Sequence, residues 1–105
     1  MAQQNKIGKT ATSVKQGADG SISVRYHATE VVRVDPDGVI HLDTGGWTTN
    51  TTKTRMNQTA NQFGLGFHVY QENFEWFVRL KDRYIQFERG KLSFDPKTGD
   101  MLSFG

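Results

Sequence analysis

The stretch that decides the fold is residues 31–42, which read Val31-Val32-Arg33-Val34-Asp35-Pro36-Asp37-Gly38-Val39-Ile40-His41-Leu42. Pro36 presets φ for a tight turn, and Gly38 accepts the positive φ that follows it. The apolar residues on both sides of the turn are typical of strands. We therefore predict two antiparallel strands, residues 31–34 and 39–42, joined by this turn.

The same pattern recurs near the end of the chain, where a Pro- and Gly-containing turn at residues 95–100 separates residues 92–94 from residues 101–104. A further strand is predicted before the first hairpin, because apolar and polar residues alternate strictly through residues 21–27. Its apolar positions are Ile22, Val24 and Tyr26.

Between the two hairpins, residues 50–63 are the only segment that we interpret as a helix, and Gly64 is the residue at which it should end. Its apolar stripe is narrow and consists of Met56, Ala60 and Phe63. Residues 67–70, 74–80 and 84–87 are then predicted to be strands. In residues 74–80 the alternation places Phe74, Trp76, Val78 and Leu80 on the buried face. Phe77 breaks that alternation, so we leave open that the second face is covered as well.

The chain is therefore predicted to be an α+β domain. Its antiparallel sheet should have about six to seven strands in two hairpin-rich blocks, with one central helix. Residues 1–20 are polar and contain Lys6, Lys9 and Lys15 but only one acid, Asp19. This composition favours a flexible N-terminal arm. Residues 21–105 are expected to form the single domain.

Composition narrows the function classes. The 105 residues include no Cys, so a disulfide scaffold, a thiol nucleophile and a Cys-ligated zinc ion are excluded. No apolar run reaches the roughly 18 residues of a membrane span, and the polar start lacks the apolar core of a signal peptide. We therefore expect no membrane association and a location in the cytoplasm. The net charge of +2 is too small to decide between partners.

No motif in the chain carries catalytic chemistry. Residues 45–54 superficially resemble a phosphate-binding loop, but Trp47 and Thr52 occupy positions that need glycine. His27, His41 and His68 lack the spacing of metal ligands, and no Ser has a recognisable base. We expect no enzyme, no cofactor and no metal. The rival hypothesis is an enzyme whose histidines are brought together by folding.

Residues 44–71 contain no acid at all, although they carry Lys53, Arg55 and His68. The helix presents amide, hydroxyl and basic groups in place of the usual mixture of Glu and Lys, and such a face suits hydrogen bonding to a partner. The predicted partner-binding residues, called here the helix face, are Trp47, Thr51, Thr52, Lys53, Arg55, Asn57, Gln58 and Asn61. The alternative is that the threonines cap the helix and that this face packs beneath the N-terminal arm or onto a sheet edge.

A second candidate surface is basic and contains an aromatic ring. Basic and aromatic residues on a sheet can hold single-stranded nucleic acid by neutralising phosphates and stacking on bases. The residues of this predicted basic patch are Arg79, Lys81, Arg83, Tyr84, Arg89 and Lys91. The alternative is that they form the ordinary solvent face of an antiparallel sheet whose aromatics point inward.

Several short runs, taken together, resemble a group of small proteins carried by tailed bacteriophages and prophages. The resemblance extends over residues 44–78 and rests on Gly45-Gly46-Trp47, on residues 51–58, on Phe63-Gly64-Leu65 and on Glu75-Trp76-Phe77-Val78. No catalytic residues are established for that group. The resemblance implies a small accessory phage protein in a bacterial cytoplasm, and many such proteins bind and block a host factor or defence complex.

We therefore expect a non-enzymatic phage protein that binds and inhibits a host protein or nucleoprotein complex through the helix face. The alternative function is nucleic-acid binding through the predicted basic patch.

Overall fold

The computed structural model describes residues 12–46, 50–80, 83–87, 90–97 and 101–102, and these contain nine strands and one helix. A six-stranded antiparallel sheet has the strand order β1-β2-β3-β4-β8-β9. Its strands are β1 (Thr12–Gln16), β2 (Ile22–Tyr26), β3 (Thr29–Val34), β4 (Ile40–Asp43), β8 (Lys91–Phe94) and β9 (Met101–Leu102). A three-stranded antiparallel sheet consists of β5 (Phe67–Glu72), β6 (Glu75–Leu80) and β7 (Arg83–Gln86). Helix α1 (Asn50–Phe63) lies between β4 and β5 in the chain.

The turn between β3 and β4 has the geometry that its sequence predicts. Gly38 has a φ of 95°, and its N–H donates to the carbonyl of Asp35 at 2.9 Å. The Asp35 N–H in turn donates to the carbonyl of Val39 at 2.9 Å. A left-handed residue at this position is inexpensive only for glycine. The predicted hairpin is thus confirmed.

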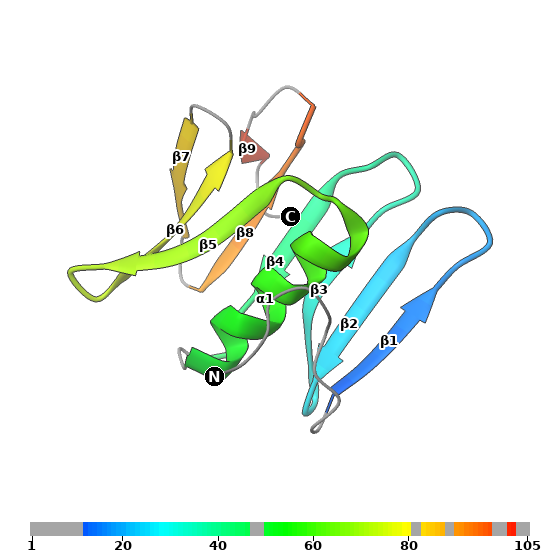
Figure 1. The fold of residues 1–105 in the computed structure, drawn as a ribbon, viewed down its shortest axis with the longest axis horizontal. Helices are drawn as coiled ribbons and strands as arrows, with labels where there is room; N and C mark the ends of the chain where they lie inside the picture. The colour runs from blue at the N-terminus through cyan, green and yellow to red at the C-terminus, as the bar shows by residue number, and fades with distance from the viewer. Residues whose placement is uncertain (1–11, 47–49, 81–82, 88–89, 98–100, 103–105) are drawn as a thin grey trace.

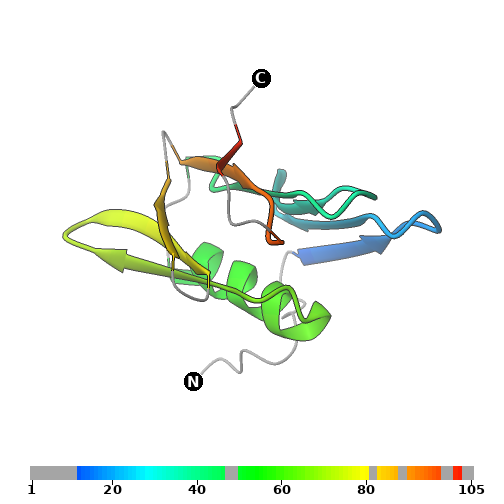
Figure 2. The same ribbon diagram turned by 90° about the horizontal axis from the view of Figure 1, so that it is seen from above.

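Two layers make up the molecule, as Figures 1 and 2 show. The six-stranded sheet forms one layer, and α1 together with the three-stranded sheet covers one of its faces. Fully buried side chains from both layers meet between them, among them Ile40, Leu42, Met56, Val78 and Phe94. The rings of Phe67 in β5 and Phe94 in β8 touch edge to face with centroids 5.8 Å apart. One continuous apolar core therefore joins the sheets and the helix.

Helix α1 ends where its sequence predicts. Gly64 takes a φ of 64°, and the Leu65 N–H donates to the carbonyl of Ala60 at 2.9 Å, which is the bonding pattern of a glycine-terminated helix. No helix in the described part of the chain is long and apolar enough to cross a membrane.

The α+β class, the antiparallel strands and the single central helix are confirmed. We expected the hairpin near the end of the chain to complete the second block, but β8 pairs with β4 and so joins the large sheet. The number of strands is higher than expected, partly because residues 12–16 form β1 at the edge of the large sheet. The sheet thus begins before the predicted boundary at residue 21. Polar composition did not reveal β1 because an edge strand needs little burial of its own, and four of its five residues are exposed. Residues 1–11 lie outside the described residues.

Phe74 also departs from its predicted place. We expected it to be the first inward-facing residue of a strand, but it lies in the turn before β6 and is 95% exposed. The turn between β5 and β6 takes Asn73 and Phe74 out of the alternating pattern, and the inward row begins at Trp76.

Candidate binding surface

The helix face predicted to bind a partner is largely inside the molecule. Thr52, Arg55, Asn57 and Gln58 are all buried, with exposed fractions of 8% or less. Lys53 is half-buried and lies over the Trp76 ring, 5.9 Å from its centroid. Among the predicted helix residues, only Thr51 and Asn61 are exposed. Trp47 lies outside the described residues.

Asn57 is used to close the free edge of strand β5. Its side-chain Nδ2 donates to the carbonyl of Val69 at 2.9 Å, and its Oδ1 accepts from the Val69 N–H at 2.7 Å. The N–H and carbonyl of Val69 point to the side of β5 where the described part of the chain places no strand, so the amide of Asn57 replaces a pairing strand at this residue. Both polar groups of the Asn57 side chain are thereby used in hydrogen bonds inside the domain.

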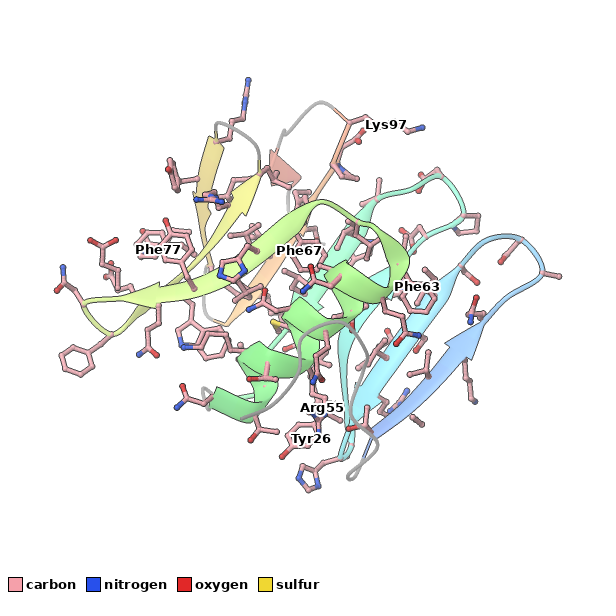
Figure 3. All side chains as sticks on the ribbon, viewed as in Figure 1. Tyr26, Arg55, Phe63, Phe67, Phe77 and Lys97 are labelled. Carbon is pink, nitrogen blue, oxygen red and sulfur yellow. The ribbon has the colours of Figure 1, made fainter. Side chains whose placement is uncertain are left out.

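Arg55 connects the helix to β1, the edge strand of the large sheet. Its Nε donates to Thr12 Oγ1 of β1 at 2.9 Å, and its Nη1 donates to Gln58 Oε1 at 3.0 Å. The guanidinium also lies over the Tyr26 ring at 5.7 Å, and Figure 3 shows the two side chains next to each other. Contacts of this kind stabilise a buried cation without a carboxylate.

The burial and the internal hydrogen bonds of these residues agree with the alternative interpretation of the helix. The helix packs against β1, which belongs to the expected N-terminal arm, and against the edge of β5. Arg55 and Asn57 are only 8% and 3% exposed, so they present little surface to a partner. Their polar groups are also used in internal hydrogen bonds, as is usual for polar groups inside a protein.

The described residues of the predicted basic patch do not come together as one surface. Register pairs Arg79 with Tyr84, and both are exposed on the same face of the three-stranded sheet. Arg83 pairs with the buried Leu80 and so belongs to the opposite face. Lys91 is in β8 of the other sheet, where it pairs with Asp43. Lys81 and Arg89 lie outside the described residues.

The outer face of the three-stranded sheet is the surface that the fold does assemble. Phe67, Val69, Trp76, Val78 and Leu80 are buried and point toward the large sheet. The alternate residues of the same strands therefore point outward. Five of these outward residues, called here the aromatic face, are His68, Tyr70, Phe77, Arg79 and Tyr84.

Three rings meet on the aromatic face. Tyr70 stacks on its cross-strand neighbour Phe77 with centroids 5.4 Å apart and an angle of 17° between the planes. Tyr70 also meets Tyr84 edge to face at 6.2 Å. Tyr84 remains 65% exposed. Figure 3 marks Phe77 in this sheet, at a distance from Arg55 of the helix and its neighbour Tyr26. Tyrosine and arginine at such positions are the side chains that most often dominate binding energy at protein interfaces.

An open hollow of about 490 Å³ is lined by His68, Tyr70, Glu72, Arg79 and Tyr84. Partial burial raises the pKa of the Tyr70 phenol, and the negative charge of Glu72 raises it further. The phenol therefore stays protonated and can donate a hydrogen bond. The hollow combines rings, a fixed cation, a carboxylate and hydrogen-bonding groups, so it can hold a surface of mixed chemistry.

One cluster resembles the connectivity of a hydrolase triad. His41 Nε2 lies 2.7 Å from Asp35 Oδ2, and His41 Nδ1 lies 2.7 Å from Ser93 Oγ. Arg33 Nε also donates to Asp35 Oδ1 at 3.0 Å. The bond from His41 holds the pKa of the Asp35 carboxyl below its ordinary value.

The serine of this cluster is nearly buried, and its strand is paired on both sides. Ser93 is only 7% exposed and faces His41 directly across the ladder between β4 and β8. Strand β8 is also paired with β9 along Ser93 and Phe94. Its backbone N–H groups are therefore used in hydrogen bonds to the two neighbouring strands and do not form an oxyanion hole. We interpret the cluster as a hydrogen-bonded row on the outer face of the large sheet.

The histidines are distributed over different surfaces. His41 lies on the outer face of the six-stranded sheet, His68 on the aromatic face, and His27 in the turn between β2 and β3. Within the described residues no group of three or more His, Cys, Asp or Glu side chains is placed to hold a metal ion.

Sequence reasoning missed His68, Tyr70 and Phe77 as members of one surface. A signal was present, since Phe77 interrupts the polar side of an otherwise alternating strand. An aromatic residue at an expected solvent position indicates either a cover or a binding face. Here Tyr70 covers part of the Phe77 ring, and Tyr84 beside it stays 65% exposed.

Comparisons with known proteins give one match. The family model described as Kyanoviridae Gp96 protein matches residues 1–95 of the chain. No curated protein and no solved structure matches.

Proposed function

Because the chain belongs to the Kyanoviridae Gp96 protein family and is therefore a bacteriophage protein, we propose that it is a non-catalytic binding protein that acts in the host cytoplasm. It captures a host protein or nucleoprotein complex and inhibits it. The contact surface is the aromatic face, in place of the helix face expected from the sequence.

The observation that carries this proposal is the group of rings on an open sheet face. Tyr70 contacts both Phe77 and Tyr84, yet Tyr84 is 65% exposed in a chain with few large exposed apolar side chains among its described residues. When a partner removes such rings from water, the free energy of the complex falls by about 25 cal/mol for each Å² of apolar area buried. Their mutual contacts hold them in place before binding, which lowers the entropic cost of association.

The charges near these rings favour a protein over a polyanion as the partner. Arg79 is a cation on the aromatic face, but Glu72 lines the same hollow, and Glu75 lies opposite Glu72 in the next strand. Mixed charges complement a protein surface, whereas nucleic acid is bound mainly by surfaces with excess positive charge.

The test is affinity capture with matched variants. The tagged full chain is incubated with nuclease-treated lysate of the bacterial host, and retained proteins are identified by mass spectrometry. Tyr84→Ala and Arg79→Ala should each reduce retention of a specific host protein by at least about tenfold, because truncated contact residues at the centre of an interface cost this much or more. Circular dichroism should show that both variants remain folded.

Lys97→Ala is the matched control, since it removes one positive charge from the exposed turn after β8, which Figure 3 marks on the large sheet. It should capture the same protein as the unchanged chain. Equal capture by Tyr84→Ala, Arg79→Ala and Lys97→Ala would show that the aromatic face is not the contact surface.

A second candidate is single-stranded nucleic acid. It is favoured by the stacked pair of Tyr70 and Phe77 on antiparallel strands beside Arg79, an arrangement that can stack bases and pair with phosphates. Binding of a fluorescent oligonucleotide should then weaken steeply between about 50 and 200 mM salt, because condensed counterions are released on binding. Absence of binding at low salt excludes this candidate.

A further inference from the structure

The turn that joins β5 to β6 carries the most exposed large apolar side chain in the described part of the protein. Phe74 is 95% exposed, compared with 65% for Tyr84 and 39% for Val14. Figures 1 and 2 both show this turn as a projecting end of the three-stranded sheet. The phenyl ring therefore contributes almost nothing to the core, although burial of a Phe ring is a major source of stability.

The backbone of this turn is also unfavourable for the residue that it carries. Asn73 has a φ of 52° and Phe74 a φ of 67°, which is the left-handed conformation of a two-residue hairpin turn. Asparagine tolerates this conformation, and glycine is the usual second residue. A phenylalanine there is strained because its Cβ crowds the backbone.

Like charges flank the same turn. Glu72 and Glu75 are directly opposite each other in the ladder of β5 and β6. Acidic side chains in this relation repel each other and weaken a hairpin. Two features of this turn, the strained φ of Phe74 and the paired carboxylates, thus oppose the stability of the free domain, and the exposed ring does not offset them. Local strain that the fold does not need is a sign of function.

We propose that Phe74 inserts into an apolar pocket of a protein partner, and that Lys or Arg side chains at the rim of the pocket pair with Glu72 and Glu75. This inference rests on the proposed function, because it describes the partner that the aromatic face binds. Binding buries the exposed ring and brings cations to two carboxylates that repel each other in the free protein. Nucleic acid and anionic bilayers do not fit, since the same carboxylates would meet phosphates.

The stability of the free protein gives the first test. Phe74→Gly relieves the strained φ and removes a side chain that is 95% exposed, so Tm should rise by about 4 °C. Asn73→Gly is the matched control in the same turn, and it should change Tm much less because asparagine already accepts a positive φ. A fall in Tm for Phe74→Gly would mean that the ring supports the fold, and it would overturn the proposal.

The chemistry of the partner gives the second test. The photoreactive residue p-benzoyl-phenylalanine is placed at position 74 of the full chain, with position 97 as the control site. After irradiation in host cells, mass spectrometry identifies the residue that has been cross-linked. The expected result is one protein, cross-linked within an apolar pocket that Lys or Arg side chains border. Cross-links to nucleic acid or lipid alone would contradict the inference.

The identified protein is then purified and its Kd measured. Phe74→Gly should weaken binding by at least about tenfold, and a double variant with Glu72→Lys and Glu75→Lys should do the same by charge reversal. If Tyr84→Ala abolishes binding while Phe74→Gly leaves the Kd unchanged, the inference fails and the proposed function stands. If neither substitution changes the Kd, both are wrong.

Discussion

Helix α1 and the aromatic face both adjoin strand β5, but they use their side chains in opposite ways. On its free edge, β5 receives the two hydrogen bonds of Asn57. On its outward side, the same strand carries Tyr70, whose ring meets Phe77 and Tyr84 at the surface. The helix, which is rich in polar residues, is a structural element, and the sheet face, which carries aromatic residues, is the open surface.

The difference teaches that polarity in a sequence does not indicate exposure. A polar side chain is buried at little cost when its donors and acceptors find partners, as those of Asn57 do at Val69. An aromatic ring can stay at the surface when the register of three strands directs it there, as with Tyr84. Substitutions in the helix should therefore change stability, whereas substitutions on the aromatic face should change binding.

The largest effect is expected for Asn57→Leu. The substitution leaves the N–H and the carbonyl of the buried Val69 without partners, so the free energy of unfolding should fall by about 3 kcal/mol. Urea unfolding measures it as a lower midpoint with an unchanged slope. Asn61→Ala, at an exposed position one turn later, is the control and should cost less than about 1 kcal/mol. Equal losses for the two variants would break the comparison.

A smaller loss is expected for Arg55→Met. It removes the bonds to Thr12 and Gln58 and the contact with the Tyr26 ring, which together should cost about 2 kcal/mol. Arg79→Met on the aromatic face is the matched control, and because Arg79 is exposed it should change stability by at most about 0.5 kcal/mol. A larger loss for Arg79→Met than for Arg55→Met would reverse the roles of the two regions.

The outer face of the large sheet should behave like the helix, since its polar groups are also paired within the chain. The bond from His41 lowers the pKa of Asp35 in the folded state, so the unfolded state binds the proton more tightly. The stabilisation is complete above the unfolded pKa of about 3.9 and is lost as pH falls through the lower folded pKa. Asp35→Asn should cost about 1 kcal/mol at neutral pH. It should also flatten the loss of stability below about pH 4. An unchanged acid profile would show that Asp35 does not contribute.

The smallest effect on stability is expected for Tyr84→Ala. With 65% of its surface exposed, Tyr84 should contribute at most about 0.5 kcal/mol to the free energy of unfolding, although the same substitution should abolish partner capture. Thermal unfolding and partner capture, measured on one preparation of the variant, test directly whether Tyr84 acts in binding and not in stability. A loss of several kcal/mol would place Tyr84 among the structural residues.

Local chemistry made the elements predictable. The turn at residues 35–38, the end of the helix at Gly64 and the inward row from Trp76 to Leu80 each follow from residues close together in the chain. The candidate site was less accessible to prediction. Asn57 and Val69 are twelve residues apart, and only the folded chain places the helix beside the free edge of β5.

By itself, the sequence determined the backbone demands and the periodicities of the chain. These specify an antiparallel α+β fold with one helix, because turn chemistry and alternation act over a few residues. Only the tertiary structure decided which polar side chains form hydrogen bonds inside the domain and which rings lie together at the surface. These outcomes depend on strand register and on where the helix packs, and both arise from contacts between residues far apart in the chain.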